Sequence, residues 1–240
     1  MFRCAFTFRS CRLLRALALF LTFVVVGCSS RPADRASSHL VLFVHGAGGD
    51  GFVYNKLVDE IQAALPEARI ERLRWGSPVF MINFSNASVH NKAETALARR
   101  IESHHTAHPQ GRVDVVAHSA GCGVALGALN KTSRAARRVI LLNPSVSPGF
   151  DLSGALAKSE SVYSFCSDRD TLFLKWRVST FGCYDRIKTP AAGFTGFTRI
   201  APNLTQIAYD DSWKKLGNDG GHFGTLARDF VRELVIPLLR

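Results

Sequence analysis

Residues 113–121, Val-Asp-Val-Val-Ala-His-Ser-Ala-Gly, decide the fold. The first five are mostly apolar and β-branched, which favours a buried strand. Small residues dominate from position 120 to 129, and this segment is predicted to be a helix. A strand that turns directly into a helix predicts a layered α/β arrangement with Ser119 at the end of the strand.

The turn at Ser119 is predicted to be very tight, so the residues two before and two after it must be small. Gly121 and Ala117 meet this requirement. The pattern resembles the nucleophile elbow of the α/β-hydrolase superfamily, although Ala117 replaces the usual glycine. The resemblance implies that Ser119 is a nucleophile whose hydroxyl stands clear of the sheet. The alternative is a chance match on an ordinary turn.

Outward from this stretch, short apolar runs alternate with segments of helical periodicity. The predicted strands are 40–44, 68–75, 113–117, 139–142, 161–166 and 204–209. The predicted helices are 52–65, 93–101, 120–129 and 224–235, the last ended by Pro237. This alternation predicts one doubly wound α/β domain, with helices on both faces of a mostly parallel sheet of about six to eight strands. The resemblance makes it an α/β-hydrolase fold.

Three segments qualify this pattern. The Asn- and Ser-rich stretch 77–91 is expected to form a surface loop, and 171–200 a helix with loops. Residues 144–160 are too few for a large cap domain. An aromatic stripe in the second stretch is expected to be core, with an acyl pocket as the alternative; it comprises Phe173, Trp176, Phe181 and Phe194.

The strand at 40–44 runs into His-Gly-Ala-Gly-Gly, residues 45–49. This loop resembles the H-G-x-G-G loop of α/β-hydrolases, which helps to form the oxyanion hole. Such a hole needs two backbone N–H groups aimed at the developing negative charge. The resemblance assigns one to Ala120 and the other to Ala47, with Gly46 as the alternative donor.

A different interpretation of the same loop is a dinucleotide site. Gly46, Gly48 and Gly51 fit G-x-G-x-x-G after a strand, and Glu71 follows about 20 residues later. That interpretation leaves His45 and the motif at Ser119 unexplained, so we favour the oxyanion loop.

His222 lies in Gly-Gly-His-Phe-Gly, between the last predicted strand and the last helix. Its position fits the chain order Ser, Asp, His of the superfamily. An imidazole pKa of about 6.5 suits a general base near neutral pH. His222 is therefore the candidate base, and His118 and His45 are expected to be structural. His104, His105 and His108 are expected to be solvated.

The carboxylate that orients this histidine follows the strand at 161–166 in the superfamily. Ser-Asp-Arg-Asp, residues 167–170, stands there. Aligning Ser167 with the glycine of the family's turn makes Asp170 the triad acid, with Asp168 as the alternative. The remaining aspartate is then a salt-bridge or cap residue near Arg169.

The N-terminus has the features of an export signal. Four arginines precede an apolar run over 16–26, which is too short to span a bilayer. Val-Val-Gly-Cys at 25–28 resembles the bacterial lipobox. The resemblance implies a lipoprotein signal peptide over 1–27 and a lipid anchor on Cys28, with an ordinary signal peptide as the alternative. Ser29 in place of Asp implies the outer membrane, on its periplasmic side.

The polar residues 28–38 are expected to be a tether and 39–240 the hydrolase domain. The whole chain carries a net charge of +11, and removing 1–27 leaves 26 basic against 19 acidic residues, a net +7. This charge favours anionic lipids, but no nucleic-acid motif accompanies it, so we predict no nucleic-acid partner. No metal-ligand spacing occurs, and the proposed chemistry needs neither a metal nor a cofactor. Whether Cys166 pairs with Cys183 stays open.

These motifs span 40–224, and the resemblance predicts a serine hydrolase that cleaves ester-type bonds through an acyl-enzyme. The substrate is expected to be a small-molecule or lipid ester, reached from a membrane anchor. Thioesterase or peptidase chemistry with the same triad is an alternative. A catalytically silent envelope binding protein with the same fold is another.

Overall fold

The computed structural model describes residues 37–77 and 82–240. Six parallel strands form one sheet in the order β2-β1-β3-β4-β5-β6. The predicted signal peptide and Cys28 lie outside the described residues. The strands are β1 (His39–Val44), β2 (Arg69–Leu73), β3 (Arg112–His118), β4 (Ala136–Leu142), β5 (Ser159–Cys166) and β6 (Leu204–Ala208).

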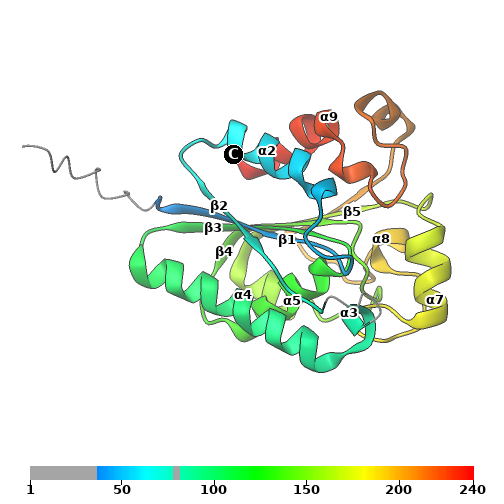
Figure 1. Cartoon of the computed structure of the whole chain (residues 1–240), viewed down its shortest axis with the longest axis horizontal. Helices are drawn as coiled ribbons and strands as arrows, with labels where there is room; N and C mark the ends of the chain where they lie inside the picture. The colour runs from blue at the N-terminus through cyan, green and yellow to red at the C-terminus, as the bar shows by residue number, and fades with distance from the viewer. Residues whose placement is uncertain (1–36, 78–81) are drawn as a thin grey trace, which may run out of the picture. The chain divides into compact units, whose positions relative to one another are not determined.

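Helices cover both faces of the sheet (Figure 1), which confirms the doubly wound α/β prediction. The larger α-helices are α2 (Asn55–Ala64), α4 (Ala87–Ala107), α5 (Gly121–Lys131) and α6 (Ser153–Lys158). Short α-helices are α3 (Ile82–Ser85), α7 (Val178–Phe181), α8 (Ala192–Thr195) and α9 (Arg228–Phe230). Turns of 3-10 or π type are Phe52–Tyr54, Leu172–Arg177, Asp211–Leu216, Gly224–Leu226, Val231–Val235 and Ile236–Leu239.

Alternation along the strands divides the core into two layers. In β1, Leu40, Leu42 and Val44 face the layer packed by α4 and α5. Val41 and Phe43 face the opposite layer, which α2 and the C-terminal helical segments cover. Because all five side chains are at most 1% exposed, β1 is buried on both faces, as expected of a central parallel strand.

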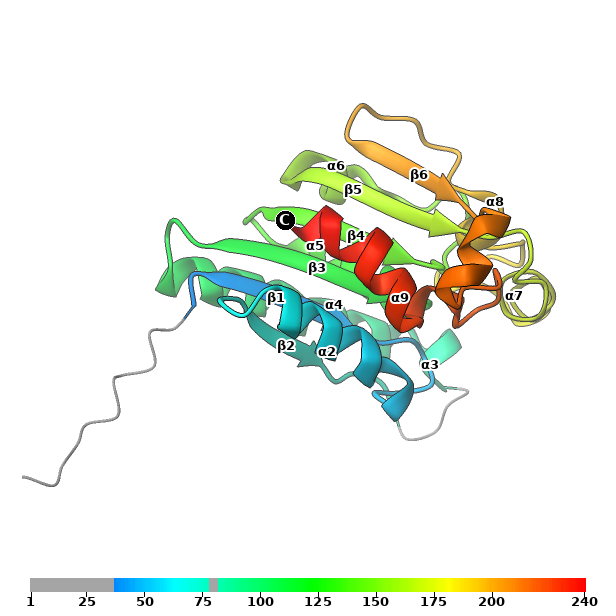
Figure 2. The same cartoon turned by 90° about the horizontal axis from the view of Figure 1, so that it is seen from above.

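All strands end at the same edge of the sheet, where α7 and α8 also lie (Figure 2). Val44 pairs with Ala117, and Ala117 pairs with Leu141, so β1, β3 and β4 end side by side. Loops that follow parallel strands therefore meet at this edge, which is where α/β sheets usually place a site.

The prediction of a loop over 77–91 is wrong in its greater part. Residues 82–85 form α3, and α4 already begins at Ala87. The Asn86 side chain accepts hydrogen bonds from the backbone N–H groups of Ser88 and Val89, so it caps α4. Asparagine favours both loops and helix N-caps, and composition alone did not separate these two uses.

Pro237 does not end the C-terminal helical region, which continues to Leu239. It lies in the first turn of a new 3-10 segment, where its missing N–H costs no helical hydrogen bond. No helix in the described part of the chain is long and apolar enough to cross a membrane.

Cys166 and Cys183, whose pairing the sequence left open, are free thiols. Their sulfur atoms contact separate carbonyls, of Ile207 at 3.8 Å and of Thr189 at 3.4 Å. His104 is buried rather than solvated, because α4 is long enough to bring its ring to the chain that enters β1.

A buried ion cluster closes the other edge of the sheet. Asp114 of β3 is fully buried and accepts hydrogen bonds from Arg137 and from the His39 ring, whose Nε2 lies 2.8 Å away. Burial by itself raises the pKa of Asp114, but these hydrogen bonds outweigh it and hold that pKa below its ordinary value. The carboxylate thus joins the starts of β1, β3 and β4.

Replacing Asp114 by alanine is expected to lower the free energy of unfolding by about 3 kcal/mol, because the Arg137 guanidinium loses its charged partner and the His39 ring loses a hydrogen-bond partner. The folded-state pKa is lowered, so this stabilisation is complete above the unfolded value of about 4 and declines as the pH falls below it. Urea unfolding at pH 7 and pH 4 measures both effects. Asp59→Ala, at an exposed site on α2, is the control; equal losses in the two variants would contradict the prediction.

Candidate active site

Ser119 occupies a strained turn between β3 and α5. Its φ is +56°, in the left-handed region that non-glycine residues rarely adopt. A Cβ on Gly121 would lie 2.4 Å from the His45 carbonyl oxygen and 2.5 Å from that of Val44. Only glycine therefore allows the first turn of α5 to approach the end of β1 this closely, and the serine is held at the edge of the sheet.

His222 lies between Ser119 and Asp170. Its Nε2 is 2.9 Å from Ser119 Oγ, and its Nδ1 is 2.6 Å from Asp170 Oδ2. All three side chains are at least nine-tenths buried. The structure thus brings together the three residues that the sequence placed in order, whereas Asp168 is exposed and contacts none of them.

The loop that carries His222 is fastened to the turn that carries Asp170. Ser167 Oγ donates a hydrogen bond of 2.6 Å to the Gly220 carbonyl oxygen. The Asn218 side chain accepts a bond from the Gly220 N–H, and Gly220 has a φ of +86°. The acid and the histidine come from different loops, so these bonds fix their separation.

The backbone N–H groups of Ala47 and Ala120 have no acceptor in the described part of the chain. Ala120 follows Ser119, and Ala47 lines the same cavity as Ser119. The Gly46 N–H, the alternative donor, is instead bonded to the Tyr54 hydroxyl oxygen at 3.0 Å. Free donors beside a serine are what an oxyanion would require.

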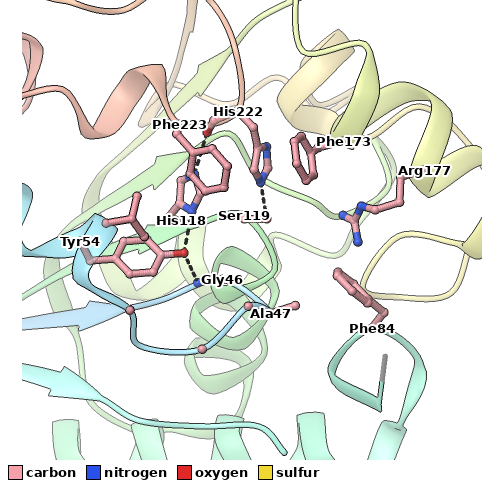
Figure 3. Close-up of a pocket in the computed structure, with 14 residues that line it drawn as sticks. Gly46, Ala47, Tyr54, Phe84, His118, Ser119, Phe173, Arg177, His222 and Phe223 are labelled. Atoms are coloured by element: carbon pink, nitrogen blue, oxygen red, sulfur yellow. Dashed lines mark hydrogen bonds between the residues drawn. The ribbon is translucent and has the colours of Figure 1, made fainter. Parts of the chain in front are cut away.

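A buried network of hydrogen bonds joins Gly46, in the glycine-rich loop 45–49, to the loop that carries His222 (Figure 3). Tyr54 Oη lies 3.2 Å from His118 Nδ1, and His118 Nε2 lies 2.9 Å from the His222 carbonyl oxygen. Burial lowers the pKa of His118 to about 3, so its ring is neutral near pH 7. Burial also raises the pKa of Tyr54 to about 12.

These protonation states set one direction of donation. The Gly46 N–H donates to the Tyr54 oxygen, and the Tyr54 hydroxyl donates to His118 Nδ1. The protonated His118 Nε2 then donates to the His222 carbonyl. His118 thus has the structural place expected from the sequence, and it holds two loops at once.

His45 braces the glycine-rich loop from the other side. Its pKa is lowered by burial, so the neutral ring donates from Nδ1 to the Gly46 carbonyl at 2.7 Å. Its Nε2 accepts a hydrogen bond from the backbone N–H of Trp75. The His45 and Trp75 rings stack with their centroids 5.6 Å apart. Asn83 Nδ2 donates to the Ala47 carbonyl at 2.9 Å. Sequence analysis did not single out Trp75 and Asn83; the only signal was that Trp75 ends a predicted strand.

A cavity of about 210 Å³ opens over Ser119. Its lining is mostly apolar and includes Val53, Phe84, Phe173 and Phe223. Arg177 brings a guanidinium group into this lining. The Phe173 ring stacks on His222 at 4.6 Å. Sequence analysis placed the aromatic stripe in the core, which is wrong for two of its members, since Trp176 is 68% and Phe181 is 60% exposed.

The described residues contain no group of three or more His, Cys, Asp or Glu side chains that could hold a metal ion. Of the predicted site residues, Cys28 lies outside the described part of the chain. All the others gather at the carboxyl edge of the sheet, around the cavity.

The sequence profile of the alpha/beta hydrolase family matches residues 41–235. This chain belongs to that family. No curated protein matches the hydrolase by sequence.

Solved structures of other proteins share its fold. One is an α/β serine hydrolase without a lid from Xanthomonas campestris, with 16% identity over 84% of each chain and a TM-score of 0.50. Another is a lipase-esterase related protein from Clostridium acetobutylicum, with 12% identity over 84% of the hydrolase and 95% of that chain and a TM-score of 0.52. At these identities the likeness establishes the fold alone.

The Tyr54→Phe variant tests the buried network in this protein. It leaves the Gly46 N–H and His118 Nδ1 without a partner, so the free energy of unfolding is expected to fall by about 1–2 kcal/mol. Urea unfolding measures the change. Tyr163→Phe is the control, because the Tyr163 hydroxyl bonds no residue in the described ranges; equal effects of the two variants would argue against the network.

Proposed function

We propose that this protein is a serine hydrolase that cleaves ester-type bonds through an acyl-enzyme. One observation carries the proposal: Ser119, His222 and Asp170 form a continuous chain of hydrogen bonds beside two free backbone N–H groups. A nucleophile, a base and an orienting acid within hydrogen-bond reach make up the minimal machinery of acyl transfer.

In the first half-reaction, His222 Nε2 takes the proton from Ser119 Oγ as that oxygen attacks the substrate carbonyl carbon. The carbonyl oxygen becomes an oxyanion, which accepts hydrogen bonds from the Ala47 and Ala120 N–H groups. His222 then gives its proton to the leaving oxygen, and the carbon–oxygen bond breaks. The acyl group stays on Ser119.

In the second half-reaction, a water molecule takes the place of the leaving group. His222 removes its proton, the water oxygen attacks the acyl carbon, and the proton returns to Ser119 Oγ as the acid leaves. Asp170 Oδ2 accepts from the Nδ1–H throughout. It therefore selects the tautomer with a basic Nε2 and stabilises the imidazolium formed in each half-reaction.

The mostly apolar cavity supports a small-molecule or lipid ester as the substrate. Its modest volume of about 210 Å³ favours a short or medium acyl group. Residues 144–160 hold only turns, α6 and the first two residues of β5, so no large cap lies in that segment. The same residues would also act on a thioester, whose carbonyl reacts by the same two steps.

Replacing Ser119 by alanine is expected to lower kcat for nitrophenyl butyrate by about 10⁴-fold or more, because the nucleophile is lost. A fluorophosphonate probe should label the wild-type protein and not this variant. Ser133→Ala, at an exposed serine, should keep both activities. A folded wild-type protein that neither labels nor hydrolyses any ester would favour the catalytically silent binding protein.

Asp170→Asn should lower kcat by about 10⁴-fold, because asparagine favours the wrong tautomer of His222. Asp168→Asn is the matched control, since the exposed Asp168 is two residues away and touches neither His222 nor Ser119. Steady-state hydrolysis of nitrophenyl butyrate measures both. Equal losses, or a larger loss at Asp168, would overturn the assignment of the acid.

A further inference from the structure

Arg177 places a positive charge in the cavity that holds Ser119. It is the last residue of the π-helical turn Leu172–Arg177, just before α7. Figure 3 shows its guanidinium beside Phe84, across Ser119 from Tyr54. The proposed acyl-transfer steps leave this residue without a task.

Two contacts hold the Arg177 side chain in place. Its Nη2 donates to Ser145 Oγ at 3.2 Å, and its guanidinium carbon lies 4.0 Å from the centroid of the Phe84 ring. Neither contact neutralises the charge, because a hydroxyl is uncharged and an aromatic ring offers only a quadrupole. Arg177 Nε is buried and has no hydrogen-bond partner among the residues that the structure describes.

No carboxylate in the described ranges lies within ion-pair distance of Arg177. By contrast, other partly buried arginines of this protein have one: Arg137 pairs with Asp114, and Arg72 pairs with Asp50. Asp170 acts on Arg177 only at longer range, and its oxygens are engaged by His222 Nδ1 and the Phe173 N–H.

An arginine in this setting carries an electrostatic cost. Burial lowers the pKa of the Arg177 guanidinium below its ordinary value, since an apolar surrounding disfavours the charged form. A charged group that stays unpaired in a cavity is best stabilised by an incoming group of opposite charge. Guanidinium donors match the planar oxygens of a carboxylate or the oxygens of a phosphate.

We propose that Arg177 is a specificity residue that binds an anionic group of the substrate, a carboxylate or a phosphate. The preferred substrate is then an ester with a negative charge on the side of the scissile bond that faces Phe84. This inference rests on the proposed function and narrows it, because an apolar cavity alone would favour neutral esters. The uncharged part of the substrate lies against the apolar lining of the cavity, which includes Val53 and Phe223.

Matched pairs of esters test the proposal on the acyl side. One set comprises mono-nitrophenyl esters of dicarboxylic acids from glutarate to suberate, and the other comprises nitrophenyl alkanoates of equal chain length. Wild-type kcat/KM should favour the charged ester by about tenfold to a hundredfold at one chain length, as expected for a hydrogen-bonded ion pair. The chain length at which the preference is largest indicates how far the Arg177 guanidinium lies from the ester carbonyl bound at Ser119.

Arg177→Met should abolish that preference by lowering kcat/KM for the charged esters about tenfold or more beyond any change for the neutral esters, whereas Arg177→Lys should keep part of it. Arg134→Met removes an exposed arginine at the opposite edge of the sheet and should leave the preference intact. A purely structural role, in which Arg177 only anchors Phe84, would instead lower both ester sets equally. That result overturns the proposal.

A second pair places the charge on the alcohol side. Lysophosphatidate and monoacylglycerol with the same acyl chain differ only in the phosphate. A preference for the phosphate ester that Arg177→Met removes supports the proposal and identifies phosphate as the anion. The proposal is overturned if the wild-type protein prefers the charged ester in neither the acyl-side pair nor the alcohol-side pair. It is also overturned if Arg177→Met keeps the preference that the wild-type protein shows.

Binding separates failure of this proposal from failure of the proposed function. Titration calorimetry measures the binding of suberate and of glycerol 3-phosphate to the Ser119→Ala variant. The same titrations on a double variant, which carries both Ser119→Ala and Arg177→Met, show whether binding needs Arg177. If no ester is hydrolysed but an anion binds only when Arg177 is present, the anion site stands and the hydrolase function fails. If neither ester hydrolysis nor anion binding occurs, both are overturned.

Discussion

The close approach between the first turn of α5 and the end of β1 is the constraint on which the rest of the site depends. Gly121 lacks the Cβ that would collide with the carbonyl oxygens of Val44 and His45. With α5 seated there, Ser119 is forced to a positive φ and its hydroxyl stands at the edge of the sheet. The same contact fixes the glycine-rich loop relative to Ser119, because that loop begins at His45. One steric fit therefore sets both the nucleophile and the donors around it.

Two neutral histidines hold the loops around Ser119 in fixed positions relative to one another. His118 and His45 have their pKa values lowered by burial, so each ring donates from one nitrogen and accepts at the other. One ring links the Gly46 loop to the His222 loop, and the other links the same loop to Trp75. An imidazole that carried a proton on both nitrogens would lose an accepting position in each network. His118 and His45 thus hold the loops of the site in place, whereas His222 is the histidine that contacts Ser119 Oγ.

The sequence predicted the strands, their mostly parallel arrangement and the three side chains at the sheet edge, because buried parallel strands are continuous apolar runs and chain order restricts the partners of Ser119. Only the turn after β5 pointed to Asp170, the carboxylate that the structure places beside His222. It did not predict that Asn86 caps α4, since asparagine suits loops equally. It also missed Tyr54 and Trp75, whose contacts arise between segments far apart in the chain and leave no local pattern. Cys166 and Cys183 show the same limit, because two cysteines in sequence say nothing about the distance between them.

The strand order β2-β1-β3-β4-β5-β6 also has a consequence for synthesis on the ribosome. β1 is made first but lies between β2 and β3, so its pairing on both sides is complete only after residues 112–118 have been made. The histidine loop comes more than 100 residues after Ser119. A nascent or truncated chain can therefore pair β1 to β4, the last of which ends at Leu142, before a base stands beside Ser119. The hydrogen bond between His222 and Ser119 forms only after residue 222 has left the exit tunnel.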